Sequence, residues 1–141
     1  MFNIVLLTSE FPPGPGGIGN HAYYLAMNLH SNPLYNVKVI TLSRCSDDYL
    51  FDNRISFEIE RVNNHNKISS LFSGLIKIIR TLLNKKYSII ICSGSWALIQ
   101  ISLIKPIFSS VKLINLAHGL DINPVKNYKR FFVNIAMQYS D

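Results

Sequence analysis

Residues 8–30, with the sequence TSEFPPGPGGIGNHAYYLAMNLH, join an apolar segment to a helix through a loop rich in proline and glycine. Four of the seven glycines in the chain lie within six residues of this loop, from Gly14 to Gly19. Glycine lets a backbone approach a ligand closely, and the first N–H groups of a helix are unpaired at the positive end of its dipole. The stretch therefore predicts an anion site that suits phosphate, although a simple connector between strand and helix has the same composition.

Outward from this loop, short apolar segments alternate with amphipathic ones. The patterns predict strands at 2–8, 37–43, 55–60, 88–92 and 111–117, and helices at about 18–29, 68–83, 96–104 and from Pro124 onward. Residues 44–54 are polar and are predicted to form turns, and the alternation of polar and apolar residues at 55–60 predicts a strand near the sheet edge.

The order of these elements predicts an α/β fold, a Rossmann-like, doubly wound domain whose largely parallel sheet has helices on both faces. The glycine loop follows the first strand, and His118 and Gly119 follow the fifth. In open sheets of this kind, ligands bind outside the carboxyl ends of the strands. We therefore expect the loop and His118 to share one edge of the sheet.

Composition and charge narrow the classes of protein. With 141 residues, 48% of them hydrophobic and 16% charged, the chain is expected to form one domain with a normal core. A net charge of +6 favours anionic partners, but no basic cluster interleaved with aromatic residues suggests nucleic acid. Two distant cysteines, Cys45 and Cys92, fit buried thiols in a reducing compartment. Residues 1–8 are interpreted as a strand rather than a signal peptide, and a cytoplasmic protein is expected.

The pattern Gly14-x-Gly16-x-x-Gly19 matches the dinucleotide fingerprint, but its context differs. The fingerprint places its first glycine directly after the strand, whereas residues 9–13 intervene here. Residues 41–44, TLSR, stand where a ribose-binding acid is expected. An NAD(P)-dependent Rossmann enzyme therefore remains only an alternative, and the lysine-bearing phosphate-loop motif is absent.

Four segments in this order resemble a known family. They are FPPGPGGIGNHAYYLAMNL at 11–29, VKVITLS at 37–43, KYSIIICSGS at 86–95 and INLAHGLD at 114–121. Together they resemble the N-terminal half of family 4 glycosyltransferases, which have the two-domain GT-B fold. The resemblance covers essentially the whole chain.

The resemblance implies that a sugar passes from a nucleotide-sugar donor to a glycan or lipid-linked acceptor, with retention of configuration and without a metal or other cofactor. It also suggests a role in surface polysaccharide or lipopolysaccharide assembly. Gly16 and Gly17 match the double glycine that approaches the donor diphosphate. His118 matches the catalytic-site histidine that lies close to the transferred sugar.

Four further residues are candidates for the acceptor side of the cleft: Glu10, His21, Gly119 and Asp121. Each has an ordinary alternative, because loop acids commonly cap helices or face solvent, a helical histidine is often solvated, and a glycine such as Gly119 often only forms a turn. His118 itself has the alternative of satisfying nearby carbonyl groups. We expect a bulky substitution at Gly16 or Gly17 in the full-length enzyme to abolish transfer while leaving the fold intact.

The resemblance also implies a second, donor-binding domain that residues 1–141 do not contain. The expected domain organisation is thus a single, apparently truncated N-terminal domain over 1–141, inactive alone, with a separately encoded C-terminal half as a possible partner. A non-catalytic binding or assembly module is the other alternative. Basic residues in 68–86, with Lys126, Lys129 and Arg130, are candidates for peripheral contact with the inner face of the cytoplasmic membrane, although such charges usually face solvent.

Overall fold

The computed structural model describes residues 1–84, 87–118 and 127–140. The strands are β1 (Phe2–Thr8), β2 (Tyr35–Leu42), β3 (Glu58–Val62), β4 (Ile89–Ser93) and β5 (Lys112–Leu116). The helices are α1 (Gly17–Ser31), α2 (Asp48–Asp52), α3 (Lys67–Leu83), α4 (Ser95–Ile104) and α6 (Asn127–Gln138). The predicted start of the last helix at Pro124 lies outside the described residues.

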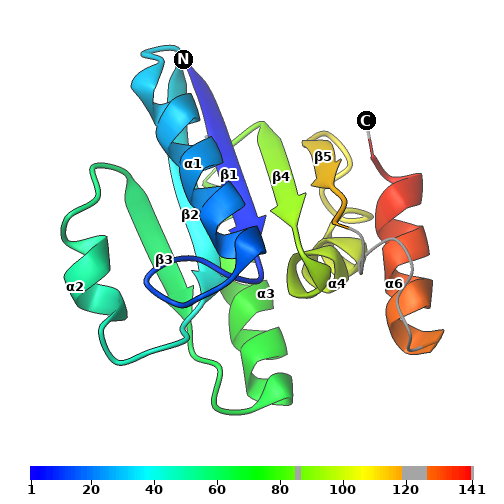
Figure 1. The fold of residues 1–141 in the computed structure, drawn as a ribbon. Coiled ribbons are helices and arrows are strands. Elements are labelled where there is room, and N and C mark those ends of the chain that lie inside the picture. The colour runs from blue at the N-terminus through cyan, green and yellow to red at the C-terminus, as the bar shows by residue number, and fades with distance from the viewer. Residues whose placement is uncertain (85–86, 119–126, 141) are drawn as a thin grey trace.

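The strands form one sheet in the order β3-β2-β1-β4-β5, and every pairing is parallel (Figure 1). β1 is central, and its residues Val5, Leu6 and Leu7 are fully buried. Its uninterrupted apolar sequence reflects this position, since a central parallel strand is covered on both faces. The predicted doubly wound, Rossmann-like fold is confirmed.

Two hydrophobic clusters cover the two faces of the sheet. α1 packs on one face through Ala22 and Ala26, and Phe51 of α2 joins the same cluster. α3, α4 and α6 pack on the other face, where Ile78, Ile101 and Val133 are among their buried residues. The chain thus winds over one face between β1 and β3 and over the opposite face between β3 and β5, as two-sided winding requires.

The polar segment before β3 departs from the prediction. Residues 48–52 form the short helix α2, and β3 begins at Glu58 rather than at residue 55. β3 does lie at the sheet edge, as its alternating sequence predicts. Lys38 of β2 forms ion pairs of 2.7 and 2.8 Å with Glu58 and Glu60, and these pairs cross from β2 to the edge strand.

The two cysteines have different environments. Cys92 is fully buried in β4, and burial raises the pKa of its thiol, so it behaves as a small neutral side chain. Cys45 is exposed, so the expectation of burial is wrong for this residue. A hydrogen bond of 3.2 Å from Cys45 Sγ to Asp48 Oδ1 raises the pKa of the Cys45 thiol.

α3 and α4 approach each other closely at Gly74. A Cβ atom at Gly74 would lie 2.5 Å from Nε2 of Gln100 and 2.7 Å from Cζ2 of Trp96. Gln100 Nε2 also donates a hydrogen bond of 3.1 Å to the carbonyl oxygen of Leu71. α3 and α4 are therefore in close contact near Gly74, where a side-chain hydrogen bond also joins them. No helix among the described residues is long and apolar enough to cross a membrane.

Gly74→Ala should destabilise the fold, although alanine is the better helix former by about 1 kcal/mol. We expect the free energy of unfolding to fall by about 1–3 kcal/mol, because the added methyl group must displace Trp96 or Gln100. Urea denaturation measures the change. The matched control Ser69→Ala lies at an exposed position of α3 and should stay within about 0.5 kcal/mol of the unsubstituted protein. A Gly74→Ala variant as stable as its parent would contradict the close packing of α3 on α4.

Candidate functional site

The carboxyl ends of β1 and β4 lie side by side, and the winding direction reverses between them. The backbone N–H of Ser9 donates to the carbonyl oxygen of Ser93 at 3.0 Å, and Ser9 Oγ accepts a 3.0 Å hydrogen bond from the N–H of Trp96. Gly94 has φ of 87°, and a Cβ atom there would collide with Ser9 Oγ. In doubly wound sheets, ligands bind in the crevice at this kind of reversal.

The glycine loop begins α1 next to this crevice. Gly16 is the N-cap residue with φ of 150°, no side chain caps the helix, and no acidic residue lies in its first turn. A Cβ atom at Gly16 would collide with Oε2 of Glu10, whereas a Cβ atom at Gly17 would meet nothing within 4 Å. Gly17 therefore faces open space at the positive end of the helix, where an anion can approach the backbone.

Two anchors hold the glycine loop against the domain. Phe11 is fully buried and makes edge-to-face contacts with Tyr23, Phe51 and Phe57 at centroid distances of 6.0–6.4 Å. Arg61, from the edge strand β3, donates a hydrogen bond to the carbonyl oxygen of Pro12. Its guanidinium group thus connects the glycine loop to the edge strand β3.

Arg61 is itself held by two carboxylates of α2. It pairs with Asp52 at 2.7 Å and with Asp48 at 3.1 Å. Asp48 also accepts hydrogen bonds from Ser43 Oγ at 2.7 Å and from the N–H of Arg44 at 3.0 Å. Burial alone would raise the pKa of Asp48, but these hydrogen bonds and the Arg61 charge outweigh it and lower the pKa. Sequence reasoning missed this network, whose only signal was an aspartate-rich segment before the edge strand.

Three polar side chains meet at the ends of β4 and β5. His118 Nε2 and the buried Ser93 Oγ are hydrogen-bonded at 2.9 Å. The ring of His21 stacks edge-on against that of His118 with centroids 5.5 Å apart. His21 lies four residues after Gly17, one turn along α1. The expectation that the glycine loop and His118 share an edge is therefore confirmed, and His21 connects them.

The other predicted residues have different outcomes. Glu10 packs beneath Gly16 and pairs with Arg44 at 2.8 Å, so its carboxylate is already neutralised. Gly119 and Asp121 lie outside the described residues. Within residues 1–84, 87–118 and 127–140, no group of three or more histidine, cysteine or acidic side chains could hold a metal ion.

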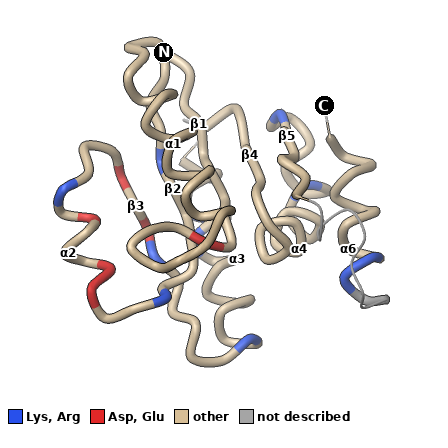
Figure 2. The backbone as a smooth tube through the Cα atoms, viewed as in Figure 1, with Lys and Arg blue, Asp and Glu red and all other residues tan. Residues whose placement is uncertain are grey.

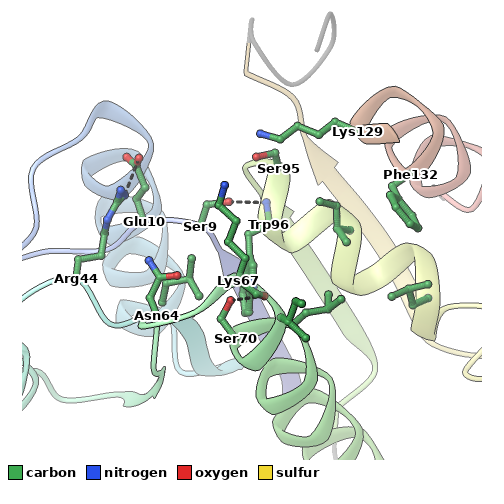
Figure 3. A pocket seen from close by; sticks show the side chains of 15 residues that line it. Ser9, Glu10, Arg44, Asn64, Lys67, Ser70, Ser95, Trp96, Lys129 and Phe132 are labelled. Carbon is green, nitrogen blue, oxygen red and sulfur yellow. Dashed lines mark hydrogen bonds and ion pairs between the residues drawn. The ribbon is translucent and has the colours of Figure 1, made fainter. Parts of the chain in front are cut away.

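A groove of about 650 Å³ opens at the same edge of the sheet, on the face that carries α3, α4 and α6 (Figure 3). We call it the helix groove. Its apolar walls include Leu71 of α3, Trp96 and Ile99 of α4, and Phe132 of α6. Arg44, Lys67 and Lys129 contribute cations to it, and Ser9 and Glu10 form its boundary with the glycine loop.

Comparisons with known proteins support the fold. No family model matches the chain, and no curated protein matches its sequence. The structure is similar to that of Anabaena Alr3699/HepE in complex with UDP and glucose, at 17% identity and a TM-score of 0.69. It is also similar to UDP-GlcNAc 2-epimerase from Methanocaldococcus jannaschii, at 14% identity and a TM-score of 0.64.

Each of these similarities includes 99% of this chain but only 36% of the HepE chain and 38% of the epimerase chain. The chain therefore spans less than two fifths of either relative. At such identities the likeness establishes the fold, which is that of a Rossmann-like domain in GT-B-type proteins. Membership in family 4 remains a prediction.

Gly16 and Gly17 should respond differently to the same substitution. Gly16→Ala should lower the free energy of unfolding by about 1–3 kcal/mol, because a positive φ and the Glu10 carboxylate both oppose a side chain. Gly17→Ala should stay within about 0.5 kcal/mol of its parent, since nothing occupies the space. Guanidinium denaturation of both variants tests this. The geometry at Gly16 therefore opposes the earlier expectation that the fold tolerates bulk at both positions, and equal losses in the two variants would contradict the difference.

The Asp48 network makes a pH-dependent contribution to stability. A lowered folded-state pKa means that the contribution is complete above the unfolded value near 3.8 and is lost as the pH falls through the lower folded value. Asp48→Asn should therefore cost about 1–3 kcal/mol at pH 7 and progressively less below about pH 4. Urea denaturation at a series of pH values measures it. The exposed neighbour variant Asp47→Asn should change stability by less than about 0.5 kcal/mol, and a pH-independent cost for Asp48→Asn would exclude the mechanism.

Proposed function

We propose that this chain is the N-terminal half of a nucleotide-sugar-dependent glycosyltransferase that transfers with retention of configuration to a glycan or lipid-linked acceptor. The observation that carries the proposal is the open N-terminus of α1 at Gly17, with His21 of the same helix against His118. The resemblance of the sequence motifs to family 4 enzymes points to the same function.

The proposed chemistry follows from charge. When a sugar leaves a nucleoside diphosphate, the departing phosphate oxygen gains negative charge. Backbone N–H groups fixed at a helix N-terminus stabilise such charge without reorganising, and they act most strongly where water is excluded. In this chain Gly17 and Ile18 present those groups. The first turn of α1 contains no acidic residue, and the Glu10 carboxylate, which lies against Gly16, is paired with Arg44.

The histidines have separate roles in this proposal. His118 donates a hydrogen bond to a hydroxyl group of the transferred sugar or to the departing oxygen, and the buried Ser93 hydroxyl fixes the direction of its ring. His21 supports His118 from α1 through the ring contact of 5.5 Å. His118 therefore acts on the substrate, and His21 is a positioning residue.

The similarity to an epimerase structure favours one second candidate, a nucleotide-sugar epimerase. Both candidates need a diphosphate bound at α1, so binding alone does not separate them. The products do, because an epimerase converts a UDP-sugar into its epimer without an acceptor, whereas a transferase releases UDP when an acceptor is present. The observed resemblance of the motifs favours transfer.

Nucleotide binding tests the shared part of the proposal. Titration of the ¹⁵N-labelled protein with UDP-glucose should shift the backbone amide resonances of Gly17 and Ile18, and Gly17→Val should abolish these shifts while the remaining spectrum stays folded. In the gene product at its full natural length, His118→Ala should lower the transfer rate about a hundredfold, while the exposed-histidine control His65→Ala leaves it unchanged. Residues 1–141 alone are expected to show no turnover.

Saturable NAD binding without any response to UDP, UDP-glucose or GDP-mannose would overturn the proposal in favour of the nicotinamide alternative. Epimerised UDP-sugar in the absence of acceptor would replace transfer by epimerisation. Full transfer activity of the His118→Ala variant would remove His118 from the site.

A further inference from the structure

The helix groove lies beside the proposed nucleotide site but on the opposite face of the sheet. Its walls come from three helices, with Leu71 of α3, Trp96 and Leu103 of α4, and Phe132 of α6 (Figure 3). Its volume of about 650 Å³ is within the range of sites that hold small organic ligands. Seven of the fifteen residues that line the groove are apolar, and a wall of aliphatic and aromatic side chains favours a hydrocarbon. Polar residues, among them Asn64, Ser70 and Ser95, line the rest of the groove.

The contact between α3 and α4, whose residues Leu71 and Trp96 line the groove, is close-packed. Gln100 ties α4 to the carbonyl oxygen of Leu71 at 3.1 Å, and the bare Cα of Gly74 lets the Trp96 ring pack directly against α3. Ser9 Oγ accepts from the N–H of Trp96 at 3.0 Å and fixes the start of α4. A ligand entering such a groove loses little free energy to ordering of the protein.

The cations at the groove have few acidic neighbours. Lys67 and Lys129 form no ion pair with any residue in the described part of the chain, whereas Arg44 is paired with Glu10. From Arg61 onward the sequence contains only two acidic residues, Asp121 and Asp141, and neither is among the described residues. Figure 2 shows that the acidic residues of the described part of the chain lie along α2, β3 and the glycine loop.

Helix dipoles add to this positive charge. Neither α3 nor α4 has an acidic residue in its first turn, and both begin at the groove, at Lys67 and Ser95. The side-chain oxygens of Asn66 and Ser9 accept hydrogen bonds from the N–H groups of Ile68 and Trp96, but no carboxylate in either first turn offsets the positive helix ends. Lys67 and Lys129 project near these ends (Figure 3). The groove thus combines apolar walls with a cationic mouth, which complements a molecule that has a hydrocarbon chain and an anionic head.

We propose that the helix groove binds an anionic amphiphile, a single hydrocarbon chain that ends in a phosphate or diphosphate. Resting on the proposed function, this molecule is the acceptor, so the acceptor class is a lipid phosphate rather than a free glycan. An oxygen of its terminal phosphate forms the new bond to C1 of the donor sugar, the bond from C1 to the diphosphate oxygen breaks, and the nucleoside diphosphate leaves. The chain lies between Trp96, Leu103 and Phe132, and the phosphate lies between Lys67 and Lys129.

The surface outside the groove fits a long chain. Ile68 lines the groove and is 66% exposed, and Phe72 and Ile76 follow it on α3 with exposures of 61% and 50%. Their spacing of four residues places them in one stripe along the helix. A hydrocarbon longer than the groove passes onto this stripe, which covers apolar surface that otherwise faces water.

The single tryptophan of the chain makes the test direct, because Trp96 lies in the groove wall. Trp96 fluorescence should change saturably when the protein is titrated with decyl phosphate below its micelle concentration. Octyl, nonyl and decyl phosphates should bind with affinities that rise about three- to fourfold for each added CH₂ group. Decanol should bind more weakly than decyl phosphate, and inorganic phosphate should leave the fluorescence unchanged.

Substitutions test separately how the hydrocarbon chain and the phosphate head of the ligand are bound. Leu103→Asp should lower the affinity for decyl phosphate more than about tenfold, because a carboxylate would lie against the hydrocarbon. The control Leu34→Asp, an exposed leucine outside the groove, should have no effect. Lys67→Ala and Lys129→Ala should each lower decyl phosphate affinity about two- to fivefold and leave decanol binding unchanged. Lys112→Ala at the opposite edge of the sheet is the matched control, and circular dichroism confirms folding of each variant.

Three outcomes would overturn the proposal. Inorganic phosphate that competes equally with decyl phosphate would mean a plain anion site. A response only to vesicles containing anionic phospholipid, with none to monomeric amphiphile, would mean adsorption on a membrane surface. Equal affinities across the chain-length series would exclude burial of the hydrocarbon.

No nucleotide is present in these titrations, so the groove and the proposed transferase can fail separately. Binding of decyl phosphate without binding of UDP-sugar would support the groove proposal and contradict the proposed function. Binding of UDP-sugar without binding of decyl phosphate would support the proposed function and contradict a lipid-phosphate acceptor.

Discussion

The parallel pairing of β1 with β4 is the constraint on which the rest of the molecule depends. It places Thr8 opposite Ser93 at the carboxyl ends of the two strands. From β1 the chain continues into α1 on one face of the sheet, and from β4 it continues into α4 on the other. Both helices therefore begin at one crevice, and two positive helix ends converge where the backbone of β1 hydrogen-bonds to that of β4.

The glycine loop has its position because residues far from it in the sequence hold it there. Phe11 fills the core beneath the loop, and Arg61 reaches from the edge strand to the carbonyl oxygen of Pro12. Asp48 and Asp52 pair with Arg61 and hold its guanidinium group in this position. A charged network at the sheet edge thus sets the geometry of a loop at its centre, and the open backbone at Gly17 is a consequence of tertiary structure as much as of local sequence.

The fold was predictable from the sequence because the spacing of apolar and polar residues along each segment indicates which of its faces are buried. The continuous apolar segment of β1 and the alternation before β3 indicated the centre and the edge of the sheet. The helix groove was not predictable, because Lys67, Trp96 and Lys129 belong to three helices and none is unusual in its own segment. The helix α2 and the start of β3 were missed for a related reason. The buried residue of α2 is Asp48, an acidic residue that a sequence pattern assigns to the surface, and its partners Arg61 and residues 43–45 come from outside the helix.

The crevice at the end of β1 has positive groups on both faces of the sheet, and this arrangement affects how the protein can hold two anionic ligands at once. Phosphate groups in one cavity repel each other strongly when water is excluded. In this chain the N-terminus of α1 faces one side of the β1 end, and Lys67 and Lys129 face the other. Under the proposed function, the donor diphosphate and the acceptor phosphate are each stabilised by their own positive groups. The strand ends with Ser9 and Ser93 lie between the two groups of positive charge, where C1 of the donor sugar must meet the attacking phosphate oxygen.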